Sequence, residues 1–144
     1  MARNRGSEAE DDFSDLWAKV GKRAYLCWLV DAAEIKGRTG RIGLARAQPS
    51  DALLVFDGRT EFAEVKSTED HSAFHFKLLR KSQSAAATMI LAAGGTYIVY
   101  LRSWVQGCWY RVPYTQITAT KATGKASIPW HELEPFKWNL PTPT

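Results

Sequence analysis

The segment from Gln48 to Lys66 constrains the fold more than any other part of the chain. Two short apolar runs flank Asp57-Gly58, a pair that favours a type I′ turn because both central positions need a positive φ. The segment is therefore predicted to form a β-hairpin with a two-residue loop. Such a loop pairs Phe56 with Arg59 and sets every other opposed pair on the two strands.

In this register two acidic side chains face each other. Asp51 lies opposite Glu64, on the face that also carries Lys66, with the two Cβ atoms about 5 Å apart. Like charges this close destabilise a sheet. Either one carboxyl stays protonated, or Lys66 neutralises the pair, or a divalent cation lies between them. A loop of three residues would instead place the acids on opposite faces.

The first part of the chain is predicted to be helical. Apolar residues three and four apart indicate an amphipathic helix over residues 8–20, and Ser7-Glu-Ala-Glu10 has the pattern of a capping box. Residues 22–36 fit either a second helix or a buried strand from Tyr25 to Val30. We favour the helix.

The second half repeats the alternation of helix and strand. Residues 76–93 are rich in helix-forming residues and end at Gly94-Gly95. Residues 96–101 and 108–112 have the composition of strands, and Gln106-Gly107 marks the turn between them. With the hairpin, these elements predict an α/β fold whose central mixed sheet is flanked by helices.

The remaining segments are predicted to be loops. Residues 36–43 are rich in glycine and basic residues, and they lack the Gly-Lys-Ser/Thr end of a P-loop. Residues 118–144 are expected to form an irregular tail. A chain of 144 residues has the size of one domain, so we predict a single domain over 1–144 with its core over about 4–117.

Composition limits the compartment and the chemistry. The sequence has no run of about 18 apolar residues and no apolar stretch near its start, so a soluble, cytoplasmic protein without a membrane partner is expected. Cys27 and Cys108 form no Cys-x-x-Cys pattern and are predicted to be small buried hydrophobes. Two carboxylates without thiolates favour Mg²⁺, for which Mn²⁺ can substitute.

Basic residues are unevenly distributed. The net charge is +4, yet the segment from His71 to His131 holds seven Lys or Arg and no acidic residue. The segment from Ile35 to Ser50 likewise holds four Lys or Arg and no acidic residue. Clustered Lys and Arg gain affinity for nucleic acid by releasing counterions. A solvated basic surface is the alternative.

The spacing of Asp51 and Glu64-Val65-Lys66 resembles the Asp…(Asp/Glu)-x-Lys signature of the PD-(D/E)xK nuclease superfamily. Three other segments resemble, in the same order, the Holliday-junction resolvases of the archaeal and RecU kind. Asn4–Glu10 is similar to their Arg-Gly-x-x-x-Glu, Phe74–Gln83 to the entry into their second helix, and Gly94–Leu101 to the strand that follows.

Two features depart from that pattern. Ser50 separates Pro49 from Asp51, and residues 36–48 are too few for the long stalk of the RecU proteins. The resemblance still implies a restriction-endonuclease-like core with the order αβββαβ.

The resemblance also implies a metal site. The ligands map onto the carboxylates of Asp51 and Glu64 and the backbone carbonyl of Val65, with Glu10 as an accessory acid and candidate ligand. Two residues have other simple explanations: Glu10 as the third helical residue of the capping box, and Asp51 as a turn residue after Pro49.

By the same resemblance, Lys66 would position or deprotonate the attacking water and Gln83 would assist from the second helix. Gln83 is otherwise a plain helix-surface residue. The implied activity is that of a Mg²⁺-dependent endonuclease making paired nicks in four-way DNA junctions as a homodimer, leaving a 5′-phosphate and a 3′-hydroxyl. The alternatives are another nuclease of the superfamily, of the restriction or repair type, and a non-catalytic DNA-binding protein.

Residues around this site are predicted to contact the DNA backbone, which positions DNA without reading its sequence. They are Arg3, Arg5, Arg38, Arg41, Arg46, Ser67, His71, His75, Lys77, Arg80 and Lys81. His71 and His75 are also four residues apart, which would suit zinc on a helix, but no third ligand is evident. Tyrosine and tryptophan residues such as Tyr97 and Trp104 are expected to pack in the core.

Overall fold

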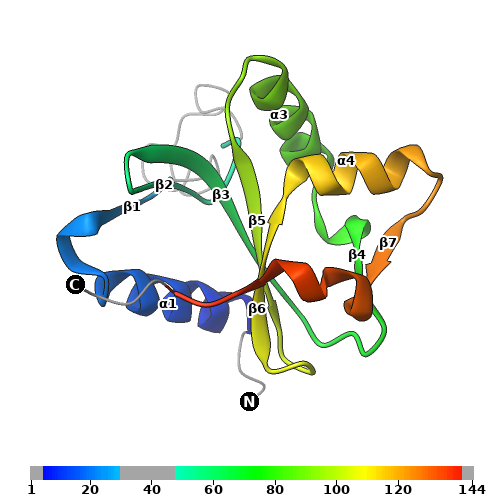
Figure 1. Ribbon diagram of the computed structural model, residues 1–144, viewed down its shortest axis with the longest axis horizontal. Coiled ribbons are helices and arrows are strands. Elements are labelled where there is room, and N and C mark those ends of the chain that lie inside the picture. Colours follow the sequence, from blue (N-terminus) through cyan, green and yellow to red (C-terminus); the bar gives the residue numbers. More distant parts are fainter. Residues whose placement is uncertain (1–4, 30–47, 141–144) are drawn as a thin grey trace, which may run out of the picture.

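The computed structural model describes residues 5–29 and 48–140 (Figure 1). Its helices are α1 (Arg5–Ala18), α3 (Lys81–Ala92) and α4 (Tyr114–Ala122), with short 3₁₀ helices at Gly21–Arg23, Phe76–Leu78 and Trp130–Phe136. Its strands are β1 (Ala24–Trp28), β2 (Ala52–Phe56), β3 (Arg59–Thr68), β4 (Ala73–His75), β5 (Tyr97–Ser103), β6 (Cys108–Pro113), β7 (Ser127–Pro129) and β8 (Lys137–Trp138). None of these helices is long and apolar enough to cross a membrane.

A six-stranded sheet forms the centre, in the order β1-β2-β3-β5-β6-β8. β3 and β5 pair in parallel, and all other neighbours in this sheet are antiparallel. β4 and β7 form a separate two-stranded ribbon. Apart from the ribbon strand β4, which lies between β3 and α3, the order α1-β1-β2-β3-α3-β5 confirms the predicted α/β class and the mixed sheet.

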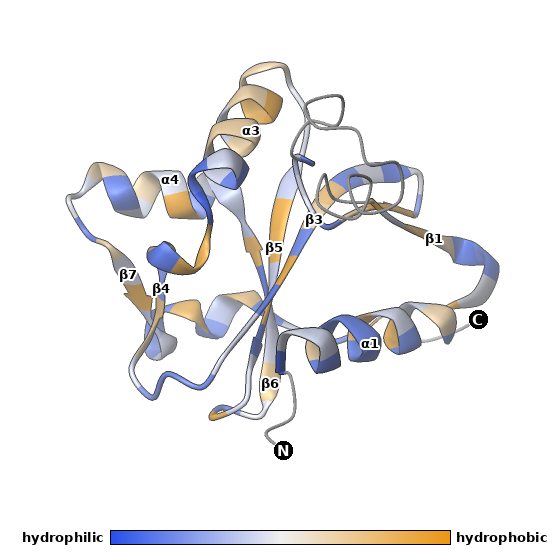
Figure 2. Ribbon diagram, turned by 180° about the vertical axis from the view of Figure 1, so that it is seen from behind, coloured by the Kyte–Doolittle hydropathy of each residue, from blue (hydrophilic) through white to orange (hydrophobic). Residues whose placement is uncertain are grey.

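Each face of the sheet carries its own core. On one face α1 packs against β2, β3 and β5 through Phe13 and Trp17. On the other, α3, α4, the β4–β7 ribbon and the last 3₁₀ helix enclose a second cluster that includes Phe74 and Ile117. Figure 2 shows hydrophobic colour along β5 and an alternation of hydrophilic and hydrophobic residues along α1. The sheet is therefore buried on both faces at its centre.

The predicted hairpin is confirmed residue by residue. Asp57 and Gly58 have φ values of 49° and 76°, as a type I′ turn requires. Phe56 pairs with Arg59 and Ala52 with Ala63, so the predicted register holds along β2.

The hairpin turn gives a first test. We expect Gly58→Ala to lower the free energy of unfolding by about 1 kcal/mol, because a Cβ is disfavoured at positive φ. No neighbouring atom lies within 4 Å of the position that this Cβ would occupy, so the cost is conformational and not a clash. Urea denaturation of the two proteins measures the difference. An unchanged midpoint would contradict the strain assigned to this turn.

The favoured helix over residues 22–36 is wrong where the structure describes it. Ala24–Trp28 is the edge strand β1, as the strand alternative predicted. Ala24 and Leu26 pack toward α1, while Tyr25 between them is 67% exposed. Residues 30–36, and the loop predicted over 36–43, lie outside the described residues.

The two predicted helices have different starts from those expected. α1 begins at Arg5 and so already contains Ser7, which is therefore not the N-cap of a capping box. α3 begins at Lys81 instead of residue 76, because Phe76 is drawn into the core by the 3₁₀ turn that precedes the helix. Its predicted end is confirmed, since Ala92 is the last helical residue and Gly94 has a φ of 89°.

The predicted strands β5 and β6 are confirmed, with Gly107 at a φ of 69° in their turn. The prediction of an irregular tail over 118–144 is wrong for its described part. α4 continues to Ala122, β7 pairs with β4, and β8 extends the sheet beside β6. The tail is ordered because Trp130 and Leu133 are buried in the core that it closes.

Candidate functional site

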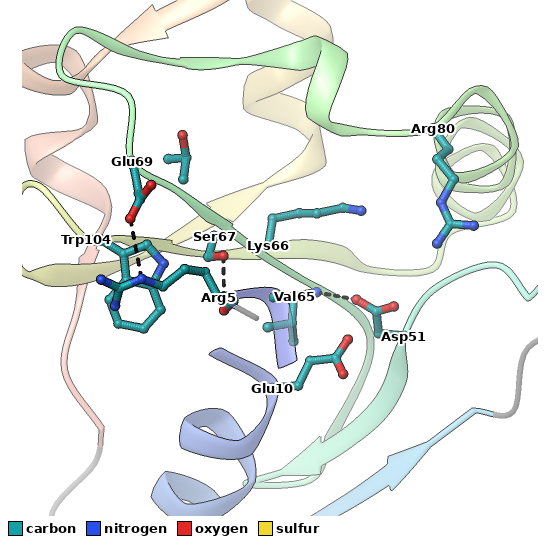
Figure 3. Close-up of a pocket in the computed structure, with 11 residues that line it drawn as sticks. Arg5, Glu10, Asp51, Val65, Lys66, Ser67, Glu69, Arg80 and Trp104 are labelled. Carbon is teal, nitrogen blue, oxygen red and sulfur yellow. Dashed lines mark hydrogen bonds and ion pairs between the residues drawn. The ribbon is translucent and has the colours of Figure 1, made fainter. Parts of the chain in front are cut away.

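A cleft opens where the start of α1, the second half of β3 and the segment before α3 meet (Figure 3). Its volume is about 570 Å³. The predicted site residues Glu10, Asp51, Val65 and Lys66 line it, together with Arg5 and Arg80. The structure thus gathers residues from four separate segments of the chain.

Asp51 is fixed where β2 begins. Its Oδ2 accepts a hydrogen bond of 2.8 Å from the backbone N–H of Val65, and its backbone carbonyl accepts one of 2.8 Å from Leu29. The side chain thus bridges the two strands of the hairpin next to Glu64. A role as a simple turn residue does not account for this bridge.

Glu64 lies on β3 next to the cleft but does not line it, because its side chain is fully buried. Gln83 Nε2 donates a 2.8 Å hydrogen bond to Oε1, and Lys66 Nζ lies 3.6 Å from the same oxygen. The Tyr97 hydroxyl lies 3.2 Å from Oε2 and 2.6 Å from the carbonyl oxygen of Pro49. If Tyr97 donates to Pro49, a protonated Glu64 can donate to Tyr97.

The surroundings of Glu64 raise its pKa to about 9. Burial is the largest cause, and the nearby Asp51 carboxyl adds to it, whereas Lys66 acts in the opposite direction. Two of the three ways to reduce the repulsion between the Asp51 and Glu64 carboxylates are therefore combined here. The Glu64 carboxyl is protonated at neutral pH, and Lys66 compensates part of the remaining negative charge.

Glu10 projects from α1 into the cleft (Figure 3). Burial raises its pKa, and Asp51 and Asp11 raise it further by repulsion. Because α1 already contains Ser7, the capping box does not explain Glu10. Glu10 lies in the same cleft as Asp51, and its role as an accessory acid stays a prediction.

Gln83 is buried, which excludes the plain helix-surface residue considered above. Its Oε1 accepts a 2.8 Å hydrogen bond from the backbone N–H of Arg80 at the start of α3, and its Nε2 donates to Glu64. One side chain therefore caps the helix and orients the buried carboxyl.

The acidic residues suit a hard cation bound partly by water. Within residues 5–29 and 48–140, no group of three or more His, Cys, Asp or Glu side chains is placed to hold a metal ion. Mg²⁺ commonly takes only one or two protein carboxylates and keeps several waters. Asp51 and Glu64 fit that requirement, so Mg²⁺ binding, and the Val65 carbonyl as a ligand, remain predictions.

Three of the predicted DNA contacts, Arg5, Ser67 and Arg80, line the cleft. Lys77 and Lys81 are exposed and do not line it. Four further predicted contacts, Arg3, Arg38, Arg41 and Arg46, lie outside the described residues.

The two histidines do not share a helical face. His75 ends β4, and its Nε2 lies 3.2 Å from Asp70 Oδ2. Hydrogen bonds from Ser72 and Ala73 keep the pKa of Asp70 well below its usual range. His71 borders a different hollow, beside His131. The helical zinc pair considered from the sequence is therefore wrong.

Two aromatic residues belong to the site although the sequence predicted them only as core. Tyr97 is buried, but its hydroxyl reaches Glu64. Trp104 is only partly buried and lines the cleft. Both are brought there by the parallel pairing of β3 with β5, which no local sequence signal reports.

Known proteins share this fold, although none was matched through its sequence. No protein-family model matches the sequence, and a search of curated proteins gave no match. Among solved structures, the chain is similar to Hjc from Archaeoglobus fulgidus, a Holliday junction resolvase from an archaeal hyperthermophile, with a TM-score of 0.59. The chain has the fold of that resolvase. The match covers 93% of this chain and 95% of that one at 16% sequence identity, and it confirms the fold that the sequence resemblance implied.

Proposed function

We propose that this chain is a Mg²⁺-dependent endonuclease that cuts branched DNA, with the four-way junction as its substrate. The observation that carries the proposal is that Asp51 and Lys66 line an open cleft of a resolvase-like fold, next to the buried carboxyl of Glu64. Its support comes from the site chemistry and from the neighbour's name, a Holliday junction resolvase.

Each residue has a physical task in this proposal. Asp51 and Glu64 would hold Mg²⁺, with Glu10 as an accessory acid, and the bound ion would acidify water and neutralise charge on the phosphate. Lys66 brings three hydrogen-bond donors close to Glu64, where it can orient the attacking water. Gln83 and Tyr97 keep the Glu64 carboxyl in place.

The proposed substrate also bears on assembly. A four-way junction has two-fold symmetry and requires two matched nicks. A C₂ homodimer, with one cleft per chain, meets that requirement. We therefore include the homodimer, acting in the cytoplasm, in the proposal.

Nicking of a labelled four-way junction and of its linear duplex arms, with Mg²⁺, tests the proposal. We expect paired nicks in the junction only, and a loss of at least about a hundredfold in Asp51→Asn, because charge stabilisation at the phosphate is removed. Asparagine can still accept the hydrogen bond from Val65, so this variant keeps the local structure. Asp15→Asn is the matched control, since Asp15 is an exposed acid on α1 outside the cleft.

Other outcomes identify the alternatives. Equal cutting of duplex DNA that depends on Asp51 would indicate a restriction or repair nuclease. Junction binding without any cutting would indicate a non-catalytic DNA-binding protein. Cutting that survives in Asp51→Asn would contradict the site.

A further inference from the structure

Arg5 lies at the end of the cleft away from Arg80, in contact with two residues that the nuclease chemistry does not use (Figure 3). Its Nε lies 3.3 Å from Glu69 Oε1, and its guanidinium carbon lies 4.7 Å from the ring centroid of Trp104. Both partners line the same cleft. Arg5 Nη1 also lies 3.6 Å from Glu8 Oε2 on α1. The position of the Arg5 charge is therefore set by an aromatic ring and two carboxylates.

The Trp104 ring is held mainly by stacking. The guanidinium of Arg102 also lies against it, at 5.0 Å from the centroid. Within residues 5–29 and 48–140, Trp104 Nε1 and Arg102 Nε are buried without a hydrogen-bond partner. The Trp104 backbone N–H donates a 3.0 Å hydrogen bond to the carbonyl oxygen of Thr68, which fixes Trp104 at the end of β3. A fixed ring of this kind orients a guanidinium by a cation–π interaction.

Glu69 holds Arg5 only weakly. The Arg5 and Glu69 side chains are 48% and 66% exposed, and exposed ion pairs contribute little free energy. A phosphate group can form two parallel hydrogen bonds with a guanidinium, and such bonds are among the strongest in proteins. Because the Arg5–Glu69 pair is exposed and is held by a single contact at Arg5 Nε, an incoming phosphate would displace the Glu69 carboxylate.

We propose that Arg5 and Trp104 form a subsite for one phosphate of the DNA backbone, in which Glu69 occupies the phosphate position until DNA displaces it. In this inference, which rests on the proposed function, Trp104 is a positioning residue that acts through Arg5. Arg80 would contact the backbone at the other end of the cleft. Glu69 would weaken binding of any DNA that does not reach Arg5.

The role of Glu69 is tested by junction affinity in EDTA, where the DNA stays intact. We expect Glu69→Gln to bind about threefold to fivefold more tightly than the wild type at low salt, because the competing carboxylate is gone. Glu132→Gln is the matched control, since it makes the same charge change at an exposed position away from the cleft. Equal changes of junction affinity in the two variants would overturn the proposal that a DNA phosphate displaces Glu69 from Arg5.

The role of Trp104 is tested by a double-mutant cycle with Arg5. We expect Arg5→Gln and Trp104→Leu each to weaken junction binding about tenfold. Each should also reduce the slope of log affinity against log salt concentration by about one. The double variant should lose little further affinity. Trp104→Phe keeps a ring and should restore most of the affinity. Arg80→Gln and Trp104→Leu should instead combine additively, because Arg80 lies at the other end of the cleft.

These measurements separate the subsite from the function on which it rests. If the wild type binds and nicks the junction, but the losses of affinity in Arg5→Gln and Trp104→Leu simply add in the double variant, the subsite alone would be overturned. Absence of junction binding by the wild type would overturn both proposals. If Trp104→Leu does not fold, the comparison of Glu69→Gln with Glu132→Gln still decides, because both replaced residues are exposed.

Discussion

Glu64→Gln is expected to stabilise the protein at neutral and alkaline pH when no divalent cation is present. Burial and Asp51 raise the pKa of Glu64 from 4.5 to about 9, so the folded state favours the protonated carboxyl. The stability that this proton contributes is fully present below pH 4.5 and is lost as the pH rises toward 9. Glutamine is neutral at every pH. The free energy of unfolding of the variant should therefore exceed that of the wild type by roughly 3 kcal/mol at pH 7.

Urea denaturation in EDTA at pH 5 and pH 8 measures this gain. The gain should be small at pH 5 and largest at pH 8. Glu61→Gln is an informative contrast, because Glu61 is also buried on β3 but its Oε2 lies 2.5 Å from Arg111 and its Oε1 accepts from the Tyr100 hydroxyl. Removing that charge leaves the Arg111 guanidinium without its carboxylate partner and should lower the free energy of unfolding by roughly 2 kcal/mol. A Glu64→Gln gain that is the same at both pH values would contradict the raised pKa.

The site was predictable from sequence wherever its geometry is local. Asp57-Gly58 determines the turn, the turn determines the register, and the register places Asp51 opposite Glu64. The same reasoning failed over residues 24–28, because a short apolar run on an edge strand has the same local pattern as one face of a helix. β1 is a strand because it pairs with β2, which is a distant part of the sequence.

The contributions of Tyr97 and Trp104 could not be predicted for a related reason. β5 joins β3 in parallel only after the chain has passed through β4 and α3, so the register between them is a tertiary property. The start of α3 was misplaced because burial of Phe76 and the cap formed by Gln83 outweigh helix propensity. Gln83 was found only through the family resemblance, and the structure now gives its contacts.

Mg²⁺ affinity is expected to rise steeply with pH. A cation that binds the Glu64 carboxylate must displace the proton that this group holds below its pKa of about 9. The apparent affinity should then increase about tenfold per pH unit, or about a hundredfold from pH 6.5 to 8.5. Isothermal titration calorimetry in buffers of different ionisation enthalpy should count about one proton released per ion at pH 7. An affinity that is independent of pH would remove Glu64 from the ligands.

The same titration assigns the role of Glu10. Burial and repulsion by Asp51 raise the pKa of Glu10 as well, so a cation that also binds Glu10 displaces part of a second proton at low pH. If Glu10 is a ligand, Glu10→Gln should weaken Mg²⁺ binding and reduce the proton release at low pH. If Glu10 only adds negative charge beside Asp51, the affinity should fall severalfold with the proton release unchanged. The resemblance leaves these two roles open, and counting protons separates them because only a direct ligand must lose its proton to the ion.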